Sequence, residues 1–246
     1  MKVTFLGTNG WYDTATGNTP CVFVETLEQY IVFDAGFGFC KVKDLVHSEK
    51  PVHLFISHMH LDHLIGLHTL PLFKIPQGID IYVPKKSEKI LLNLLKRPLT
   101  SSPFQLSTRI RFHRVEEKQK LPFGFEFKPL RHSVPCYGYR IIADGAEVSY
   151  CTDTGICGNL KRLAKKADLF ITECALAPGD RVPALFHITP EIAARVAAGS
   201  DARKLALFHF DPGNYPTFEA RKKAQVAAGK IFPNTIAAND GTEIVI

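Results

Sequence analysis

The sequence predicts a layered α/β fold in which two β-sheets pack together and helices cover their outer faces. Short apolar runs lead in each half of the chain, and stretches with helical spacing follow them. The chain has 246 residues, of which 46% are hydrophobic, so it can bury a large core. Because no linker, repeat or charge block divides the sequence, we expect residues 1–246 to form one domain.

The expected strands are short apolar runs bounded by turn-forming residues. They cover residues 2–7, 20–26, 30–34, 52–57, 123–128, 138–143, 147–152, 168–172 and 205–208, with two more short strands at the C-terminal end. The expected helices cover residues 85–96, 159–167, 189–199 and 217–228. The third has the clearest start, since Thr189 is a typical N-cap and Pro190 suits the first turn. Residues 98–114 are interpreted as an irregular, basic segment.

Composition narrows the functional classes. No apolar stretch of the sequence is long enough to span a bilayer, so a membrane partner is not expected. The first seven residues alternate like a strand and not like an export signal. The six cysteines are therefore interpreted as reduced thiols, and the expected location is the cytoplasm. The formal net charge of +6 favours anionic partners but is modest for a dedicated nucleic-acid binder.

The strongest functional signal is the run HMHLDH at residues 58–63, directly after a predicted strand. His58 and His60 project to the same side of an extended chain, and Asp62 and His63 begin an expected helix beside them. Imidazole and carboxylate ligands suit zinc, and also manganese or iron. A single histidine is more often structural, and a His-rich tract can bind metal unspecifically. Four such side chains behind a buried strand instead predict two metal ions.

Three further residues each follow an apolar strand in the same way: His132, Asp153 and His209. Catalytic residues often lie on such loops because a rigid scaffold positions them. A residue of this kind that stands alone is more often structural than functional. Together with the cluster at 58–63 they supply one more ligand for each ion and a carboxylate between the ions.

The order HxHxDH, then His, Asp and His, resembles the metallo-β-lactamase fold, a four-layer αβ/βα sandwich. The resemblance covers essentially the whole chain, including the segment 238–244 at its end. It implies two divalent metal ions, with zinc favoured and manganese or iron as alternatives. The implied ligands are His58, His60 and His132 for the first ion and Asp62, His63 and His209 for the second, with Asp153 bridging.

The diiron redox branch of this superfamily typically has Glu at the position of His60, so a hydrolytic, zinc-type site is favoured. Further segments resemble ribonuclease Z: a Gly-Tyr-Arg run at 138–140, a strand ending at Glu173, and His187 ahead of a helix. The resemblance implies that His187 contacts the scissile phosphate and that Glu173 orients it. The expected catalytic residues are therefore His187, Glu173 and Asp62. The structural alternatives are a helix-entry role for His187 and a cap or surface ion pair for Glu173.

One departure from ribonuclease Z limits the expected substrate. Many bacterial forms insert a long tRNA-gripping arm ahead of the bridging Asp, whereas only residues 141–152, enough for a β-hairpin, separate Arg140 from Asp153 here. Thr152 also replaces the family's glycine. The remaining basic candidates for RNA contacts are Arg97, Arg109, Arg111 and Arg114.

The leading prediction is a dinuclear phosphodiesterase that uses a metal-bridging hydroxide on small, cyclic or nucleotide-type phosphodiesters. The alternatives are a tRNA 3′-end endonuclease without the arm, so that RNA is the substrate, and a thioesterase or lactonase. The acyl hydrolases need no pair like His187 and Glu173. A non-enzymatic binding or metal-sensing protein is the fourth alternative. By resemblance, a homodimer is expected.

Overall fold

The computed structural model describes residues 1–117, 120–180 and 186–246. Two mixed sheets organise these residues. The strands of the first sheet are β1 (Lys2–Gly7), β2 (Cys21–Glu25), β3 (Tyr30–Phe33), β4 (Val52–Phe55), β5 (Ile79–Val83), β6 (Ile110–Arg114) and β13 (Glu243–Val245). The strands of the second are β7 (Gly124–Pro129), β8 (Tyr137–Ala143), β9 (Ala146–Cys151), β10 (Leu169–Glu173), β11 (Leu205–Phe208) and β12 (Thr235–Ala237). The strand orders are β13-β1-β2-β3-β4-β5-β6 and β12-β11-β10-β9-β8-β7.

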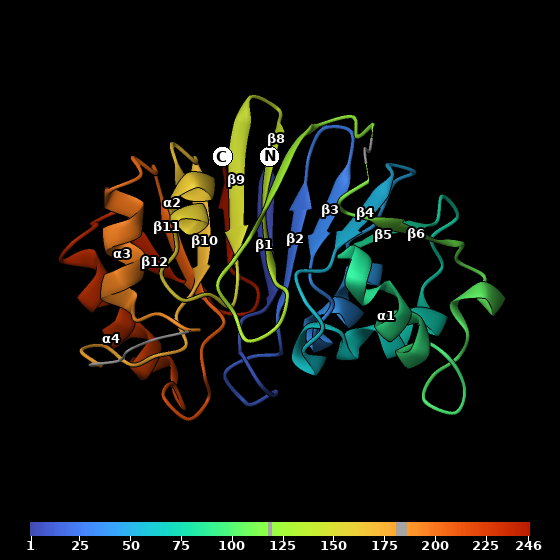
Figure 1. Cartoon of the computed structure of the whole chain (residues 1–246), viewed down its shortest axis with the longest axis horizontal. Helices are drawn as coiled ribbons and strands as arrows, with labels where there is room; N and C mark the ends of the chain where they lie inside the picture. The colour runs from blue at the N-terminus through green and yellow to red at the C-terminus, as the bar shows by residue number, and fades with distance from the viewer. Residues whose placement is uncertain (118–119, 181–185) are drawn as a thin grey trace.

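Helices cover the two outer faces (Figure 1). The α-helices are α1 (Glu88–Leu94), α2 (Gly158–Ala164), α3 (Pro190–Ala198) and α4 (Phe218–Gly229). Helix α1 lies on the side of the first sheet, together with the 3₁₀ helices η1 (Phe37–Asp44) and η3 (Ile65–Leu72), whereas α2, α3 and α4 cover the second sheet. None of the helices in the described ranges is long and apolar enough to cross a membrane.

Three buried apolar clusters separate the four layers. One lies between the sheets and is rich in aromatic rings, such as the stacked pair Phe33 and Tyr150 at 4.8 Å between centroids. The other two lie under the helices of each outer face. This αβ/βα arrangement confirms the fold class predicted from the sequence.

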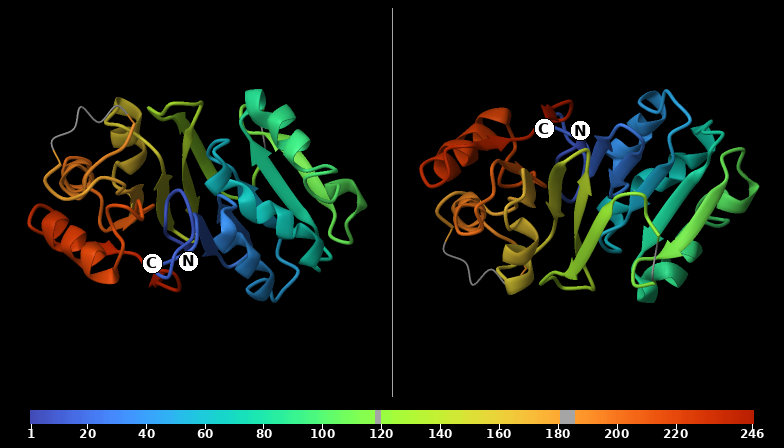
Figure 2. Two further views of the ribbon diagram at one scale, coloured as in Figure 1. Left: turned by 90° about the horizontal axis from the view of Figure 1, so that it is seen from below. Right: turned by 90° about the horizontal axis from the view of Figure 1, so that it is seen from above.

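The parallel strands direct their carboxyl ends to one edge of the sandwich. Strands β3 to β6 run parallel to one another in the first sheet, and β9 to β12 do so in the second. Loops that leave the carboxyl ends of parallel strands meet at a common edge, where such folds place their ligands. The two chain termini lie side by side, because β1 pairs with β13 (Figure 2).

Two segments differ from the sequence-based predictions. The interpretation of residues 98–114 as wholly irregular was wrong, since 110–114 form β6. Ile110 is buried there, and Arg111 pairs with Asp80 of β5. The helix expected at Asp62 consists of short 3₁₀ turns, η2 (Leu61–His63) and then η3.

A buried arginine ties the N-terminal loop to the C-terminal one. Arg221 of α4 is 1% exposed, and its Nη1 donates to Thr8 Oγ1 at 2.8 Å and to Asn239 Oδ1 at 3.1 Å. Its Nη2 donates to Asn9 Oδ1. Burial lowers the pKa of Arg221 to about 10, which still leaves it charged at neutral pH. Arg221 thus fixes the start of the loop that follows Asn9, and this loop begins next to the carboxyl end of β11.

Replacing Arg221 with Ala should leave these buried oxygen acceptors without their donor and lower the free energy of unfolding by on the order of 3 kcal/mol. The exposed neighbour Lys222→Ala should change it by less than about 0.5 kcal/mol. Urea denaturation of both variants measures the difference. Equal losses in the two variants would contradict the anchoring role of Arg221.

Candidate metal centre

The structure brings together all seven residues for which metal binding was predicted. Each lies on a loop that follows the carboxyl end of a strand: residues 58–63 follow β4, His132 follows β7, Asp153 follows β9 and His209 follows β11. They form two adjacent groups, His58, His60, His132 and Asp153, and Asp62, His63 and His209. Within each group the potential ligand atoms lie within 4.8 Å of one another.

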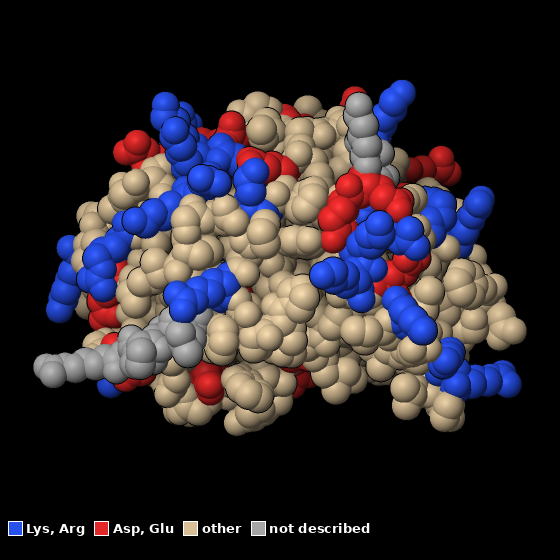
Figure 3. All heavy atoms as spheres, viewed as in Figure 1, with Lys and Arg blue, Asp and Glu red and all other residues tan. Residues whose placement is uncertain are grey.

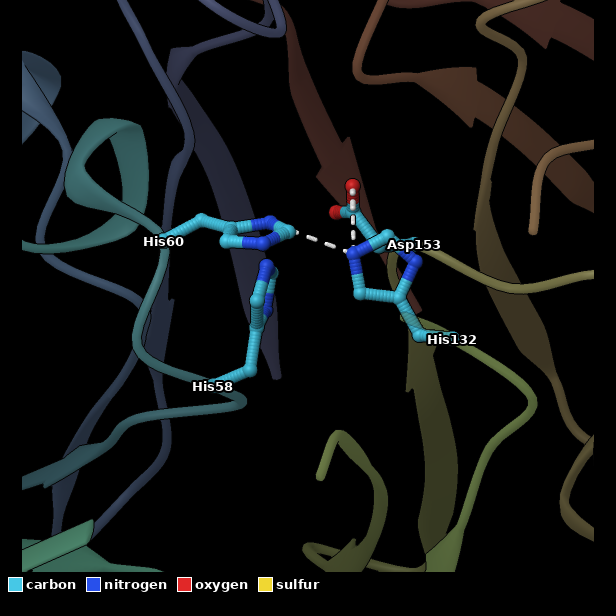
Figure 4. A group of neighbouring side chains, drawn as sticks. All are labelled: His58, His60, His132 and Asp153. Carbon is cyan, nitrogen blue, oxygen red and sulfur yellow. Dashed lines mark hydrogen bonds and ion pairs between the residues drawn. The ribbon is translucent and has the colours of Figure 1, made fainter. Parts of the chain in front are cut away.

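The first group joins side chains from both sheets (Figure 4). His58 and His60 reach in from the first sheet, and His132 and Asp153 face them from the second. His132 Nε2 lies 3.1 Å from His60 Nδ1 and 3.9 Å from Asp153 Oδ1. Burial lowers the pKa of His132 to about 4, so its ring is neutral and keeps a lone pair for a cation.

The second group surrounds the other oxygen of Asp153. Asp153 Oδ2 lies 3.1 Å from His63 Nε2 and 3.2 Å from His209 Nε2. Asp62 Oδ2 lies 3.4 Å from His63 Nε2 and 3.5 Å from His209 Nε2. Asp153 therefore presents one oxygen to each group. A Cβ at Gly10 would lie 2.6 Å from His209 Cε1, so this close approach requires glycine.

The charges of the centre fit a bound cation. Burial lowers the pKa of His63, but Asp62, Asp34 and Asp153 outweigh it and raise this pKa well above its ordinary value. The same three carboxylates attract a metal cation to this position. The pKa of His58, by contrast, is held well below its ordinary value, first by burial and then by His63. Its Nε2 is buried and has no hydrogen-bond partner among the described residues, as an unused ligand atom would be.

Asp34 orients a histidine of each group, and the sequence analysis missed it. His63 Nδ1 donates to Asp34 Oδ2 at 2.8 Å. Ser57 Oγ also donates to Asp34 Oδ2, at 2.7 Å, and lies 2.9 Å from His58 Nδ1. Because the hydroxyl hydrogen is used on Asp34, the oxygen accepts from His58. The Nδ1 atoms of both rings are thereby fixed, which leaves both Nε2 atoms for metal. Asp34 directly follows β3, so the rule that found His132 could have found it.

The predicted pair His187 and Glu173 is in contact. His187 Nδ1 donates to Glu173 Oε1 at 2.9 Å. Burial lowers the pKa of His187, but the hydrogen bond and charge of Glu173 raise it to about 9. The ring of His187 lies 5.4 Å from that of His132 between centroids, so the pair borders the first ligand group.

A cavity of about 440 Å³ opens over the two groups. Its lining comprises Trp11, His60, Leu61, Asp62, His132, Ser133, Asp153, Phe186, His187 and His209. Trp11 was not expected at the site; its backbone N–H donates to Asp62 Oδ2 at 3.0 Å. This volume suits a small ligand.

Other residues of the resemblance have packing roles. Tyr139 is buried and donates to the carbonyl of Ile56 at 2.6 Å, and Arg140 pairs with Glu147. Thr152, the departure from the family pattern, donates to Asp153 Oδ2 at 2.7 Å and so helps to orient that carboxylate.

Asp34→Asn should weaken zinc binding about 10- to 100-fold, because the amide cannot hold both histidines as the carboxylate does. Competition with a chromophoric chelator measures the affinity, with circular dichroism as a check on folding. The exposed Asp44→Asn is the matched control. If both variants bind zinc like the parent protein, Asp34 does not orient the ligands.

Sequence comparison identifies the family. Residues 29–210 match the β-lactamase superfamily domain. A ribonuclease Z of Prochlorococcus marinus (strain MIT 9515) is 29% identical, over 98% of this chain and 98% of the relative. That alignment extends over 311 residues, more than the 246 of this chain, so the relative carries inserted segments that are absent here.

Solved structures agree on the fold. The metallo-β-lactamase fold protein YhfI from Bacillus subtilis superimposes with a TM-score of 0.80 at 22% identity, over 99% of both chains. The short form of human tRNase Z superimposes with a TM-score of 0.75 at 22% identity, over 100% of this chain and 99% of the other. The chain therefore belongs to the β-lactamase superfamily and is a metal-dependent hydrolase of the metallo-β-lactamase fold.

Proposed function

We propose that this hydrolase is a phosphodiesterase that acts on small, cyclic or nucleotide-type phosphodiesters. The observation that supports this most is the ion pair between His187 and Glu173, beside the two ligand groups. A charged imidazole can bind the negative charge of a phosphodiester. Hydrolysis of a neutral thioester or lactone needs no such partner, which makes the acyl hydrolases the weaker alternative.

The two ligand groups supply the reason to expect metal chemistry. His58, His60 and His132 would hold one divalent metal ion, and Asp62, His63 and His209 a second, with Asp153 between them. Two bound cations supply an activated water and neutralise charge that develops on the phosphate. Zinc suits these nitrogen and oxygen donors, with manganese or iron as alternatives.

The protein itself supplies a positioned proton. Nδ1 of His187 donates to Glu173, so Nε2 is the atom available to the substrate in the cavity that the ring lines. A proton there can stabilise a phosphoryl oxygen or pass to the leaving oxygen. Glu173 is 0% exposed and accepts from the backbone N–H groups of Thr154, Ala175 and Ile188, so it holds the imidazole in a fixed orientation. Asp62 lines the same cavity, next to where the phosphate would lie.

Substrate size is limited by the surroundings of the cavity. Strands β8 and β9 join directly in a tight hairpin at Asp144 and Gly145, both with left-handed backbone. This hairpin occupies the place where the resemblance to ribonuclease Z would put the tRNA-gripping arm. In the basic segment, Arg111 pairs with Asp80 and Arg114 with Glu88. On the face seen in Figure 3, Lys and Arg gather at two sides with acidic residues among them, and uncharged surface separates them. These features favour a small diester over tRNA.

RNA cleavage of the ribonuclease Z type is the second candidate. It is favoured by the curated relative, which is a ribonuclease Z similar over nearly its whole length. The chemistry at phosphorus would be the same, so only the substrate separates the two candidates.

His187→Ala should lower kcat for bis-p-nitrophenyl phosphate by about 10²- to 10⁴-fold, since it removes the positioned proton. Metal content should stay at two ions per chain, because His187 belongs to neither ligand group. The exposed His47→Ala serves as the control. Unchanged turnover of His187→Ala would remove this residue from the mechanism.

A substrate panel on metal-loaded protein separates the remaining candidates. We expect cyclic nucleotides or linear dinucleotides to be hydrolysed with kcat/KM at least about 10-fold above that for acyl-thioesters and lactones. We expect no cleavage of precursor tRNA at the 3′ end of its acceptor stem. Efficient cleavage there would establish the ribonuclease Z activity instead, and a preference for thioesters would refute the phosphodiesterase.

A further inference from the structure

The single tryptophan of the chain stands exposed at the mouth of the candidate centre. Trp11 has 67% of its surface exposed, a large fraction for a residue type that is highly buried on average. Its backbone φ of 60° is in the left-handed region, which bulky residues rarely adopt. Backbone of this kind persists only where the surroundings fix it, and it concentrates at functional sites.

The surroundings fix the backbone of Trp11 and leave its ring exposed. Its N–H donates to Asp62 Oδ2 at 3.0 Å, and the preceding N–H, of Gly10, donates to the carbonyl of Phe210 at 2.8 Å. Asn9, anchored by Arg221, donates from Nδ2 to the carbonyl of Tyr12 at 3.1 Å. The backbone that carries the indole is therefore held next to Asp62.

A second cavity adjoins the first at this ring. It measures about 230 Å³, and its apolar wall comprises Trp11, Tyr12, Phe37, Leu61 and Ile65. Trp11, Leu61 and Asp62 line both cavities, so a ligand can pass from one to the other beside the indole. Besides Asp62, the lining of the side cavity contains the acidic residue Asp13. The Asp13 carboxylate would repel a phosphate group in this cavity, so a neutral group is favoured there.

We propose that this side cavity binds the nucleobase of a nucleotide diester, stacked on Trp11, while the phosphate lies at the two ligand groups. This rests on the proposed phosphodiesterase function and narrows its substrates to nucleotides. Every nucleobase has a flat face that can stack on an exposed aromatic ring, whichever base it is. The side cavity offers such a ring on a backbone that is fixed beside the ligand groups, and a diester without a base could not use it.

Tryptophan fluorescence tests the stacking directly, because Trp11 is the only tryptophan. Thymidine 5′-monophosphate, added to metal-loaded protein with excitation at the red edge of the band, should quench the emission in a saturable way. Ribose 5-phosphate carries the same phosphate and no base, and should leave the emission unchanged. Phe104→Ala, which removes an exposed ring outside both cavities, should respond like the parent protein. Absence of quenching, or equal effects of both ligands, would overturn the proposal.

Kinetics provide the second test. The ratio of kcat/KM for thymidine 5′-(p-nitrophenyl phosphate) to that for methyl p-nitrophenyl phosphate should fall about 5- to 100-fold in Trp11→Ala and be largely kept in Trp11→Phe. An unchanged ratio in Trp11→Ala would overturn the nucleobase site while the phosphodiesterase stands. If the parent protein hydrolyses neither diester, the proposed function itself fails, and the fluorescence result still decides whether the cavity binds a base.

Discussion

The carboxylate of Asp153 is the element on which the rest of the centre depends. It is buried, it comes from the second sheet, and it lies with one oxygen toward each ligand group. Burial would raise its pKa, but His209 and His63 hold it well below the ordinary value, so it stays charged. A buried charge of this kind persists only if its partners stay in place. Those partners lie on loops of both sheets, so the centre requires the sheets to keep their packing.

Buried polar residues that do not line the cavity maintain this geometry through their hydrogen bonds. Asp34 holds the His63 ring directly and the His58 ring through Ser57, Thr152 orients Asp153, and Arg221 anchors the loop of Trp11. Each is buried and hydrogen-bonded, so the His58 and His63 rings and the Asp153 carboxylate have defined orientations. Rigid positioning suits phosphoryl transfer, which asks mainly for placement and charge stabilisation.

Much of the fold could be predicted because short apolar runs indicate strands. The clustering of the candidate ligands could be predicted because polar residues directly after such strands lie at the edge where the carboxyl ends of the strands meet. Asp34 also follows an apolar strand, so the same pattern could have marked it as a candidate site residue, but a single Asp after a strand is common. Strand β6 was missed because its arginines suggested solvent, whereas Arg111 is paired with Asp80 of the neighbouring strand. The position of Trp11 at the site could not be predicted from the sequence, because it depends on a left-handed backbone and on a hydrogen bond to Asp62. Both are set by the tertiary structure.

The most direct test of the two-metal centre is anomalous diffraction at the zinc edge from crystals of zinc-loaded protein. We expect two peaks roughly 3.5–4 Å apart. One should lie about 2.0–2.1 Å from nitrogens of His58, His60 and His132, and the other at that distance from His63 and His209, with an oxygen of Asp153 bound to each. A single peak, or peaks away from these side chains, would contradict the account.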